Sequence, residues 1–187
     1  MARRGRKFIR GTGYCWWATL SRMYDDLVSA RRARMRWNTP LSVAHADLLL
    51  DRLNVGPVTW IVDMGCGWGE LLLRAVERAV GSNPVVDDRD SRARGVGVDT
   101  DPVALERGRA LARRRGLEGR VEFVHADAAT WSGAAERALC VGSSHAFGGS
   151  RAALEALAAL VPHAGRLLFG DGCWPGSTTP GCHGHLR

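Results

Sequence analysis

The sequence predicts an α/β protein in which a doubly wound, mostly parallel sheet of about five strands lies between two layers of helices. Short apolar runs of strand length alternate with longer amphipathic segments of helical period, which is typical of this fold class. Three of the apolar runs end in aspartate, at Asp63, Asp99 and Asp127. Glycines follow the first of them, and open parallel sheets bind ligands at the carboxyl ends of their strands. We therefore expect a ligand site at that edge.

The composition is that of one globular domain of 187 residues, 45% of them apolar. The net charge of +7 is unevenly placed: residues 1–36 hold ten Arg or Lys and two Asp, giving +8, so the remainder is near −1. This basic arm could bind nucleic acid, with Trp16 and Trp17 as stacking groups. A solvated tail is the simpler interpretation, and nucleic acid is not favoured as a partner.

A basic start followed by apolar residues is the only feature that suggests export, and we interpret it otherwise. The apolar stretch near the start is short, is broken by Gly11 and Thr12, and is followed by no clear cleavage site. No apolar run approaches the ~18 residues of a membrane span. The cysteines include no C-x-x-C pair, so no metal or redox site is indicated. We expect a cytoplasmic protein with reduced thiols at Cys15, Cys66, Cys140, Cys173 and Cys182.

Two helices are predicted before the first strand. Residues 23–37 have a helical pattern that Asn38, Thr39 and Pro40 interrupt. Ser42 then caps a second helix through Leu53, with apolar residues at helical spacing.

The first strand, around Trp60–Asp63, leads into glycines at 65, 67 and 69 and a helix at 70–80. Glycine permits positive φ and a close approach of a ligand to the backbone. The helix start adds free N–H groups and a positive dipole end, which suit a carboxylate or phosphate. A dinucleotide fingerprint would need a small residue where Glu70 stands. A glycine-rich turn without a ligand is the other alternative.

The remaining elements follow at the spacing of βα units. Asp101 with Pro102 can start the helix after the second strand, so Asp99 is not needed as its cap. His125 is predicted to be a packed strand residue. In order, we expect a polar loop at 85–94, a strand at 95–99, a helix at 103–116, a strand at 120–128, a strand with its loop at 138–149, a helix at 151–161 and a strand at 166–174.

The set of Asp63, the three glycines, Asp99 and Asp127, each in its place at a strand end, resembles the class I SAM-dependent methyltransferases (SAM, S-adenosylmethionine). Their first motif typically reads hydrophobic-D-x-G-x-G-x-G. The resemblance covers roughly residues 23–174. It implies a Rossmann-like fold, SAM as the cofactor, S-adenosylhomocysteine as the product, and methyl transfer as the activity.

The resemblance also implies roles for single residues. The first glycines would hold the amino-acid part of SAM, and Asp63 would organise the turn and the ammonium region. Asp99 would accept hydrogen bonds from the ribose hydroxyls, and Asp127 with Ala128 would bind adenine. A turn-forming aspartate is the alternative for Asp127. The implied cofactor-binding residues are Asp63, Gly65, Cys66, Gly67, Gly69, Asp99, Thr100, Asp127, Ala128 and Gly142.

The loop after the fourth strand should lie beside the transferring methyl. Methyl transfer depends on alignment, and His145 is the candidate catalytic residue that orients or deprotonates the acceptor. Capping of loop backbone groups is the alternative for this histidine. No Asn-Pro-Pro-Tyr-type loop is present, so the predicted acceptor is a small molecule. Tyr24, Trp37 and Asn38 are candidate lid residues, with packing as the alternative for the aromatics.

Four segments are predicted: a basic arm (1–22), a helical lid (23–57), a SAM-binding core (58–174) and an irregular tail (175–187). The tail is too short for the helix and antiparallel strands that normally complete the resembled fold. We therefore expect a shortened or frame-shifted family member with an exposed sheet edge, which favours a homodimer. The alternatives are a SAM-binding remnant without catalysis, a nucleotide-cofactor oxidoreductase, or a basic-armed nucleic-acid binder. Cys182, His183 and His185 could take up a metal adventitiously.

Overall fold

The structure, a computed structural model, describes residues 34–56, 59–81 and 92–172. The chain divides into two compact units, residues 1–38 and 39–187. In the first unit, the described residues 34–38 contain no helix or strand. The prediction of a helix over 23–37 is therefore wrong for residues 34–37. Since no capping glycine marks a helix end there, the sequence pattern defines that end poorly. Its other residues, with the basic arm and the tail, lie outside the described residues.

The second unit contains all of the regular elements described here. Its strands are β1 (Trp60–Met64), β2 (Arg94–Asp99), β3 (Val121–His125), β4 (Arg137–Val141) and β5 (Arg166–Gly170). Its helices are α2 (Val43–Leu53), α3 (Glu70–Gly81), α4 (Pro102–Arg114) and α5 (Ser150–Leu160), with a short 3-10 helix η1 (Ser144–Phe147). No described helix is both long and apolar enough to cross a bilayer.

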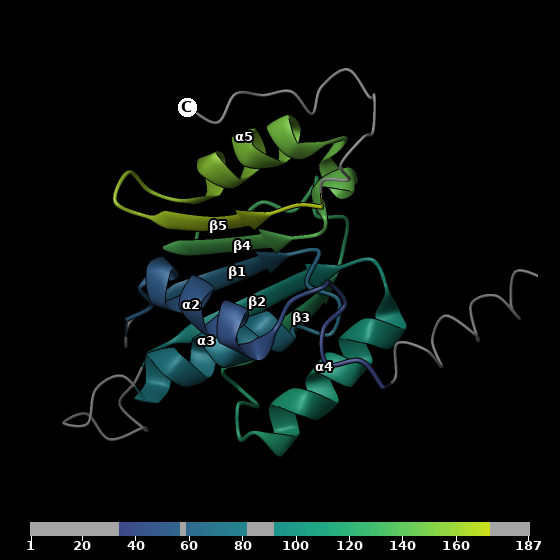
Figure 1. The fold of residues 1–187 in the computed structure, drawn as a ribbon, viewed down its shortest axis with the longest axis vertical. Coiled ribbons are helices and arrows are strands. Elements are labelled where there is room, and N and C mark those ends of the chain that lie inside the picture. The colour runs from purple at the N-terminus through teal and green to yellow at the C-terminus, as the bar shows by residue number, and fades with distance from the viewer. Residues whose placement is uncertain (1–33, 57–58, 82–91, 173–187) are drawn as a thin grey trace, which may run out of the picture. The chain divides into compact units, whose positions relative to one another are not determined.

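The five strands form one parallel sheet in the order β3-β2-β1-β4-β5 (Figure 1). The chain starts at the centre with β1, runs outward to β3, returns to β4 on the other side of β1, and ends at β5. The order reverses between β1 and β4, and in such sheets the crevice at the carboxyl ends of these strands is the ligand-binding position. The predicted doubly wound parallel sheet is confirmed.

One face of the sheet packs against α3 and α4 at very short range. A Cβ atom on Gly95 of β2 would lie 2.9 Å from side-chain atoms of both Leu72 and Val76 on α3. The ring of Phe123, on β3, lies against Gly108 of α4, where a Cβ atom would come within 2.5 Å of it. Glycines thus let both helices approach the strands, and no larger residue fits at these positions.

The opposite face packs against α5. Leu157 of α5 is fully buried there, and Trp131 packs half-buried against the same core. Residues 126–136, between β3 and β4, form no helix, so this loop covers part of the face where a doubly wound fold usually has one. The buried core residues on this face are Val62, Met64, Val96, Val98, Ala128, Ala135, Ala138, Cys140 and Leu157.

The helix before the sheet, α2, begins where the sequence predicts. The Ser42 hydroxyl accepts a hydrogen bond from the His45 N–H at 3.1 Å, which caps the helix. Asn54 ends it in the left-handed conformation, with φ of 53°. Arg78 of α3 donates to Asp51 of α2 at 2.6 Å, so the two helices lie side by side.

Two predicted strands are longer than the observed ones. The third was expected to reach residue 128 but ends at His125, because Asp127 turns the chain by accepting the Ala129 N–H at 2.9 Å. The fifth was expected to reach residue 174 but ends at Gly170. Smaller differences of one or two residues occur at the ends of β2, α4 and α5, where periodicity defines boundaries poorly.

Candidate functional site

The glycine turn between β1 and α3 forms the centre of the candidate site. Gly65, Gly67 and Gly69 have positive φ values of 73°, 56° and 67°. Residues other than glycine adopt such backbone angles only at a cost. Gly65 also has a contact reason, because its Cβ atom would lie 2.3 Å from Cβ of Ser143 on the loop after β4. The N–H groups of Gly65 and Cys66 donate to the Val98 carbonyl of β2. The turn is thus fixed between β1, β2 and β4.

Glu70 opens α3 immediately after the turn. It is 6% exposed and pairs with Arg74 at 2.9 Å and with Arg115, just beyond α4, at 2.5 Å. An acidic side chain at a helix N-terminus is also favoured by the helix dipole. This position carries a buried ion-pair network, whereas a dinucleotide fingerprint needs a small residue there for close packing. The contacts of Glu70 therefore argue against the dinucleotide alternative.

Asp99 lies at the carboxyl end of β2 and faces the turn. Its Oδ2 accepts the Gly67 N–H at 2.7 Å, and its Oδ1 accepts the Asp101 N–H at 2.9 Å. Asp101, in turn, caps α4 through the N–H groups of Val103 and Ala104, as predicted. Each carboxylate oxygen has further acceptor capacity, so Asp99 can also accept hydroxyl hydrogens from a ligand.

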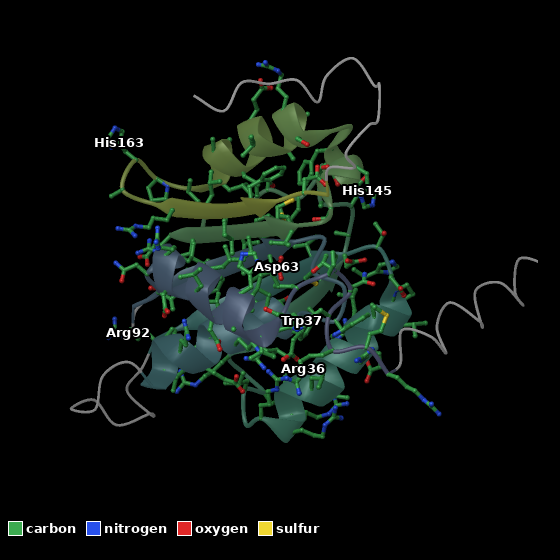
Figure 2. The ribbon with its side chains drawn as sticks, viewed as in Figure 1. Arg36, Trp37, Asp63, Arg92, His145 and His163 are labelled. Carbon is green, nitrogen blue, oxygen red and sulfur yellow. The ribbon has the colours of Figure 1, made fainter. Side chains whose placement is uncertain are left out.

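Asp63 is the buried acid of the site, with 5% of its surface exposed. Burial, and then the charge of Asp99, raise the pKa of Asp63 to about 7. Figure 2 shows Asp63 in the middle of the sheet. Two carboxylates that repel each other in this way are stabilised by a nearby positive charge. The site is therefore electrostatically suited to a cationic ligand.

The thiols near the site are poor nucleophiles. Burial raises the pKa of Cys66, and the charges of Asp63 and Asp99 raise it further. Burial also raises the pKa of Cys140, a fully buried residue of β4. Since the thiolate is the reactive form, both side chains act as small packing groups.

The residues predicted near the end of β3 are placed at the same edge but with mixed exposure. Asp127 is exposed, and its turn-forming hydrogen bond to Ala129 supports the alternative role for it. Ala128 is buried in the core. His125 is exposed, and its Nε2 lies 3.1 Å from the carbonyl of Thr100. The prediction that His125 is packed is wrong, because its register on the edge strand turns it to solvent.

The loop after β4 closes the other side of the turn. Gly142 has a φ of 77°, and its N–H donates to the Gly170 carbonyl of β5 at 2.8 Å. A Cβ atom on Gly142 would lie 2.6 Å from Cγ2 of Thr39, so the segment before α2 touches this loop. The Ser143 hydroxyl donates to the Met64 carbonyl at 2.6 Å. His145 is exposed on the same loop (Figure 2).

Three further residues of this region were not found from the sequence. The Asp171 carboxylate, just after β5, accepts hydrogen bonds from the hydroxyls of Ser144 and Ser150. No local motif contains all three, since Asp171 is 27 residues from Ser144 and 21 from Ser150. The only signal is the position of an acid directly after a strand.

Several predicted residues cannot be related to the site. Trp37 and Asn38 belong to the first unit, so their lid role stays a prediction. Tyr24 and the cysteines and histidines of the tail lie outside the described residues. Within the described ranges, no three or more His, Cys, Asp or Glu side chains gather as metal ligands.

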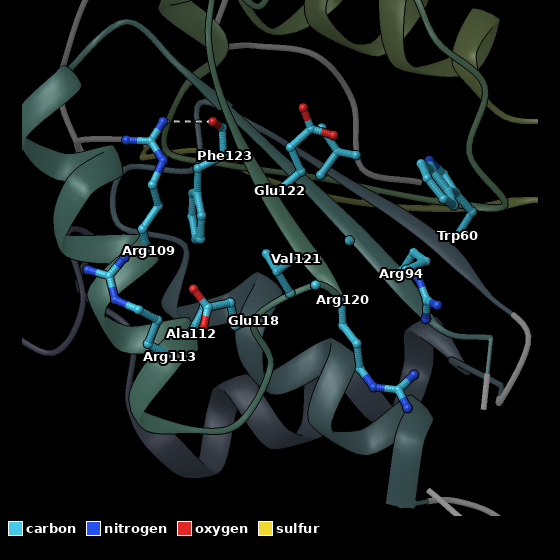
Figure 3. Close-up of a pocket in the computed structure, with 13 residues that line it drawn as sticks. Trp60, Arg94, Arg109, Ala112, Arg113, Glu118, Arg120, Val121, Glu122 and Phe123 are labelled. Atoms are coloured by element: carbon cyan, nitrogen blue, oxygen red, sulfur yellow. Dashed lines mark hydrogen bonds between the residues drawn. The ribbon is translucent and has the colours of Figure 1, made fainter. Parts of the chain in front are cut away.

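A separate cleft of about 520 Å³ lies around the amino ends of β1, β2 and β3. Trp60, Arg94 and Val121 begin these three strands and line it (Figure 3). In a parallel sheet this end is opposite the glycine turn, so the cleft is not part of the candidate site.

Comparison with known proteins identifies relatives of this fold and site. The family model of a methyltransferase domain matches residues 61–165. The uncharacterized protein YjhP of Escherichia coli is 31% identical over 124 residues, which are 65% of this chain and 45% of YjhP. The crystal structure of YjhP has a TM-score of 0.64 and 28% identity, over 76% of this chain and 54% of that one.

Several similar solved structures carry a ligand, and two of them share 25% identity with this chain. A SAM-dependent methyltransferase from Geobacter sulfurreducens, in complex with S-adenosyl-L-homocysteine, has a TM-score of 0.65 and 25% identity, over 77% of this chain and 54% of that one. One from Thiobacillus denitrificans, in the same complex, has a TM-score of 0.64 and 25% identity, over 76% and 54% of the two chains. The chain spans about half the length of these relatives.

Proposed function

Since the chain belongs to the class I SAM-dependent methyltransferase family, we propose that it binds SAM and transfers its methyl group to a small-molecule acceptor. The observation that carries the proposal is the pair of carboxylates, Asp63 and Asp99, beside the glycine turn at the carboxyl ends of β1 and β2. SAM is cationic at its sulfonium and its ammonium group, and this pair stabilises positive charge. A cationic ligand would offset the repulsion between the two acids.

The residues present fit the cofactor. Asp99, already anchored by the Gly67 N–H, has acceptor capacity for ribose hydroxyls. Because glycine has no side chain, the turn at Gly65, Gly67 and Gly69 exposes its backbone to the methionine part of SAM. The carboxylate of that part suits the start of α3. We propose the same cofactor-binding set as the sequence predicts, completed by Cys66, Thr100, Asp127, Ala128 and Gly142.

In the proposed reaction the sulfonium supplies an electrophilic methyl group. The chain contributes alignment, because a direct displacement requires acceptor, carbon and sulfur in line. The loop from Gly142 to Gly149 lies beside the glycine turn through the contact of Ser143 with Gly65. His145 on this loop would orient the acceptor or take its proton. Capping of the backbone by His145 has no support in its described contacts.

The proposal of a small-molecule acceptor rests on the composition of the loop after β4. Residues 142–145 read Gly-Ser-Ser-His, which lacks the amide and stacking aromatic of an Asn-Pro-Pro-Tyr loop. The hydroxyls of Ser143 and Ser144 are both engaged within the protein, at Met64 and Asp171. The loop therefore presents the imidazole of His145 as its main polar group.

The decisive experiment is calorimetric titration of the chain with SAM, S-adenosylhomocysteine and NAD in parallel. We expect binding of the first two and none of NAD, because Glu70 and its two arginines occupy the place of the small residue. Binding of NAD alone by the folded chain would contradict the proposal. Absence of any binding by a demonstrably folded chain would also contradict the proposal and would indicate a damaged site or a non-catalytic role. A screen of small acceptors with methyl-labelled SAM then tests transfer.

A further inference from the structure

We propose that Asp171 is a positioning residue of the transfer site, which acts through Ser144 and Ser150 to hold the loop after β4 and its His145 in place. The inference rests on the proposed function, because it takes this loop to be the acceptor side of the site.

Three elements meet at the Asp171 carboxylate. Asp171 follows the last residue of β5 directly. Its Oδ2 accepts the hydroxyl hydrogens of Ser144, in η1, and of Ser150, the first residue of α5, the latter at 2.7 Å. Its Oδ1 accepts the Gly172 N–H at 2.9 Å. A single side chain therefore joins the end of β5 to both ends of the segment that carries His145.

The loop has a second anchor on its other side. Ser143 is 6% exposed and donates to the Met64 carbonyl at the end of β1. Ser144 is 7% exposed and is held by Asp171. His145 comes next and is exposed. Its backbone is thus fixed between β1 and β5, while its imidazole is left available to a ligand.

The ionised form of Asp171 suits this role. The Ser144 hydrogen bond, assisted by Ser150, the Gly172 N–H and the charge of His145, holds the pKa of Asp171 below its ordinary value, against a smaller opposing effect of burial. An ionised carboxylate only accepts hydrogen bonds, so both serine hydroxyls must donate to it. Its charge also lies near the start of α5, where no side chain caps the helix. An amide at this position offers one acceptor oxygen and no charge.

The test compares the full chain with its D171N, S144A and S150A variants, with S-adenosylhomocysteine as the probe. NMR resonances of the His145 ring, assigned by their loss in an H145Q variant, should shift on addition of the probe in the parent chain. We expect D171N to abolish this shift while the calorimetric Kd changes less than about threefold. The matched control is Asp51→Asn, which removes the carboxylate on α2 that pairs with Arg78 of α3.

Two further readouts separate positioning from general stability. Exchange of the Ala146, Gly148 and Gly149 amides, which bond within the loop, should be about tenfold faster in D171N, with α3 amides unchanged. In the D171N background, S144A should add little to the increase in amide exchange if both residues act through one contact. Asp171→Glu, which keeps the carboxylate, should restore part of the His145 response.

The outcomes are distinguishable. If the parent chain does not bind the probe, the proposed function fails. If it binds, but the His145 response is absent in the parent chain or is the same in D171N, this inference alone is overturned. If D171N does not fold, the serine variants decide, and a normal His145 response in both would overturn it.

Discussion

At the scale of single residues, Asp99 links the glycine turn to the proposed ribose position. Replacing it by Asn keeps its shape but leaves one acceptor oxygen where two are now used. We expect Asp99→Asn to weaken SAM binding by about 1–3 kcal/mol, the usual cost of leaving polar groups unpaired, which is about 5- to 150-fold in Kd. Calorimetry measures this, with Asp51→Asn as the control. Unchanged affinity in a folded variant would contradict the ribose assignment.

Asp63 links the site to the pH dependence of stability. Its pKa is about 7 in the folded chain, against the ordinary value of 3.8 for an aspartate carboxyl. Between these values the folded chain binds more protons than the unfolded chain, so the contribution of Asp63 to the free energy of unfolding falls as pH rises through this window. Above it, the buried charge costs on the order of 4 kcal/mol.

Asp63→Asn should therefore stabilise the ligand-free chain at pH 8 and have little effect at pH 4. Urea unfolding of both chains across this range gives the difference in free energy, which should grow with pH and level off above 7. A flat difference would show that Asp63 is not a buried, titrating acid. The same variant should bind SAM less tightly, because it lacks the charge that the cationic ligand meets.

Residues that bear chemistry locally were easier to predict than residues that act through tertiary contacts. The place of Asp63 and Gly65 at the turn could be predicted because strand, turn and helix follow one another in the sequence. Asp171 could not, because its serine partners are brought to it only by the parallel pairing of β4 and β5. His125 was misplaced because an edge strand exposes residues that a central strand would bury.

At the scale of elements, α4 depends on a glycine at its contact with β3. Gly108→Ala would place a methyl group 2.5 Å from the Phe123 ring. We expect a loss of roughly 1–3 kcal/mol from overpacking, which exceeds the gain of up to about 1 kcal/mol in helix propensity. The matched control is Gly81→Ala at the end of α3, where no described atom lies within 4 Å of the added Cβ.

Urea unfolding followed by circular dichroism compares the two variants. Gly81→Ala should be neutral or slightly stabilising. Equal effects of the two substitutions would show that α4 can move away from the sheet at little cost.

Periodicity predicted the existence and order of these elements well and their limits poorly. The N-cap at Ser42 was correct because a capping residue is a local signal. The predicted end of β3 was wrong, because the turn at Asp127 interrupts a sequence that still alternates as a strand does. The absence of a helix in residues 126–136 agrees with the lack of any helical pattern there.

At the scale of the whole molecule, the two sheet edges differ in character. On β3, Glu122 and His125 are exposed, and a charged side chain such as that of Glu122 discourages pairing of edges. On β5, Leu167, Leu168 and Phe169 are apolar and only partly buried. We propose that the predicted homodimer uses β5, and we expect a dimer at micromolar concentration by light scattering.

Leu168→Lys should shift that equilibrium to the monomer, whereas His125→Lys on the opposite edge should not. Circular dichroism and SAM binding would confirm that both variants are folded. A parent chain that stays monomeric at high concentration would contradict the proposal. The cytoplasmic location remains a separate prediction that fractionation of the producing cells can test.

The place of β1 between β2 and β4 has a consequence for synthesis. Val62 pairs with Val96 on one side, but its partner on the other side, Ala138, is made much later. While the ribosome extends the chain, β1, β2 and β3 can already associate, and one edge of β1 must wait for β4. Such non-local pairing slows folding and leaves a nascent chain with an apolar strand edge that chaperones recognise. The central strand that builds the site therefore gains its second neighbour only after β4 has been made.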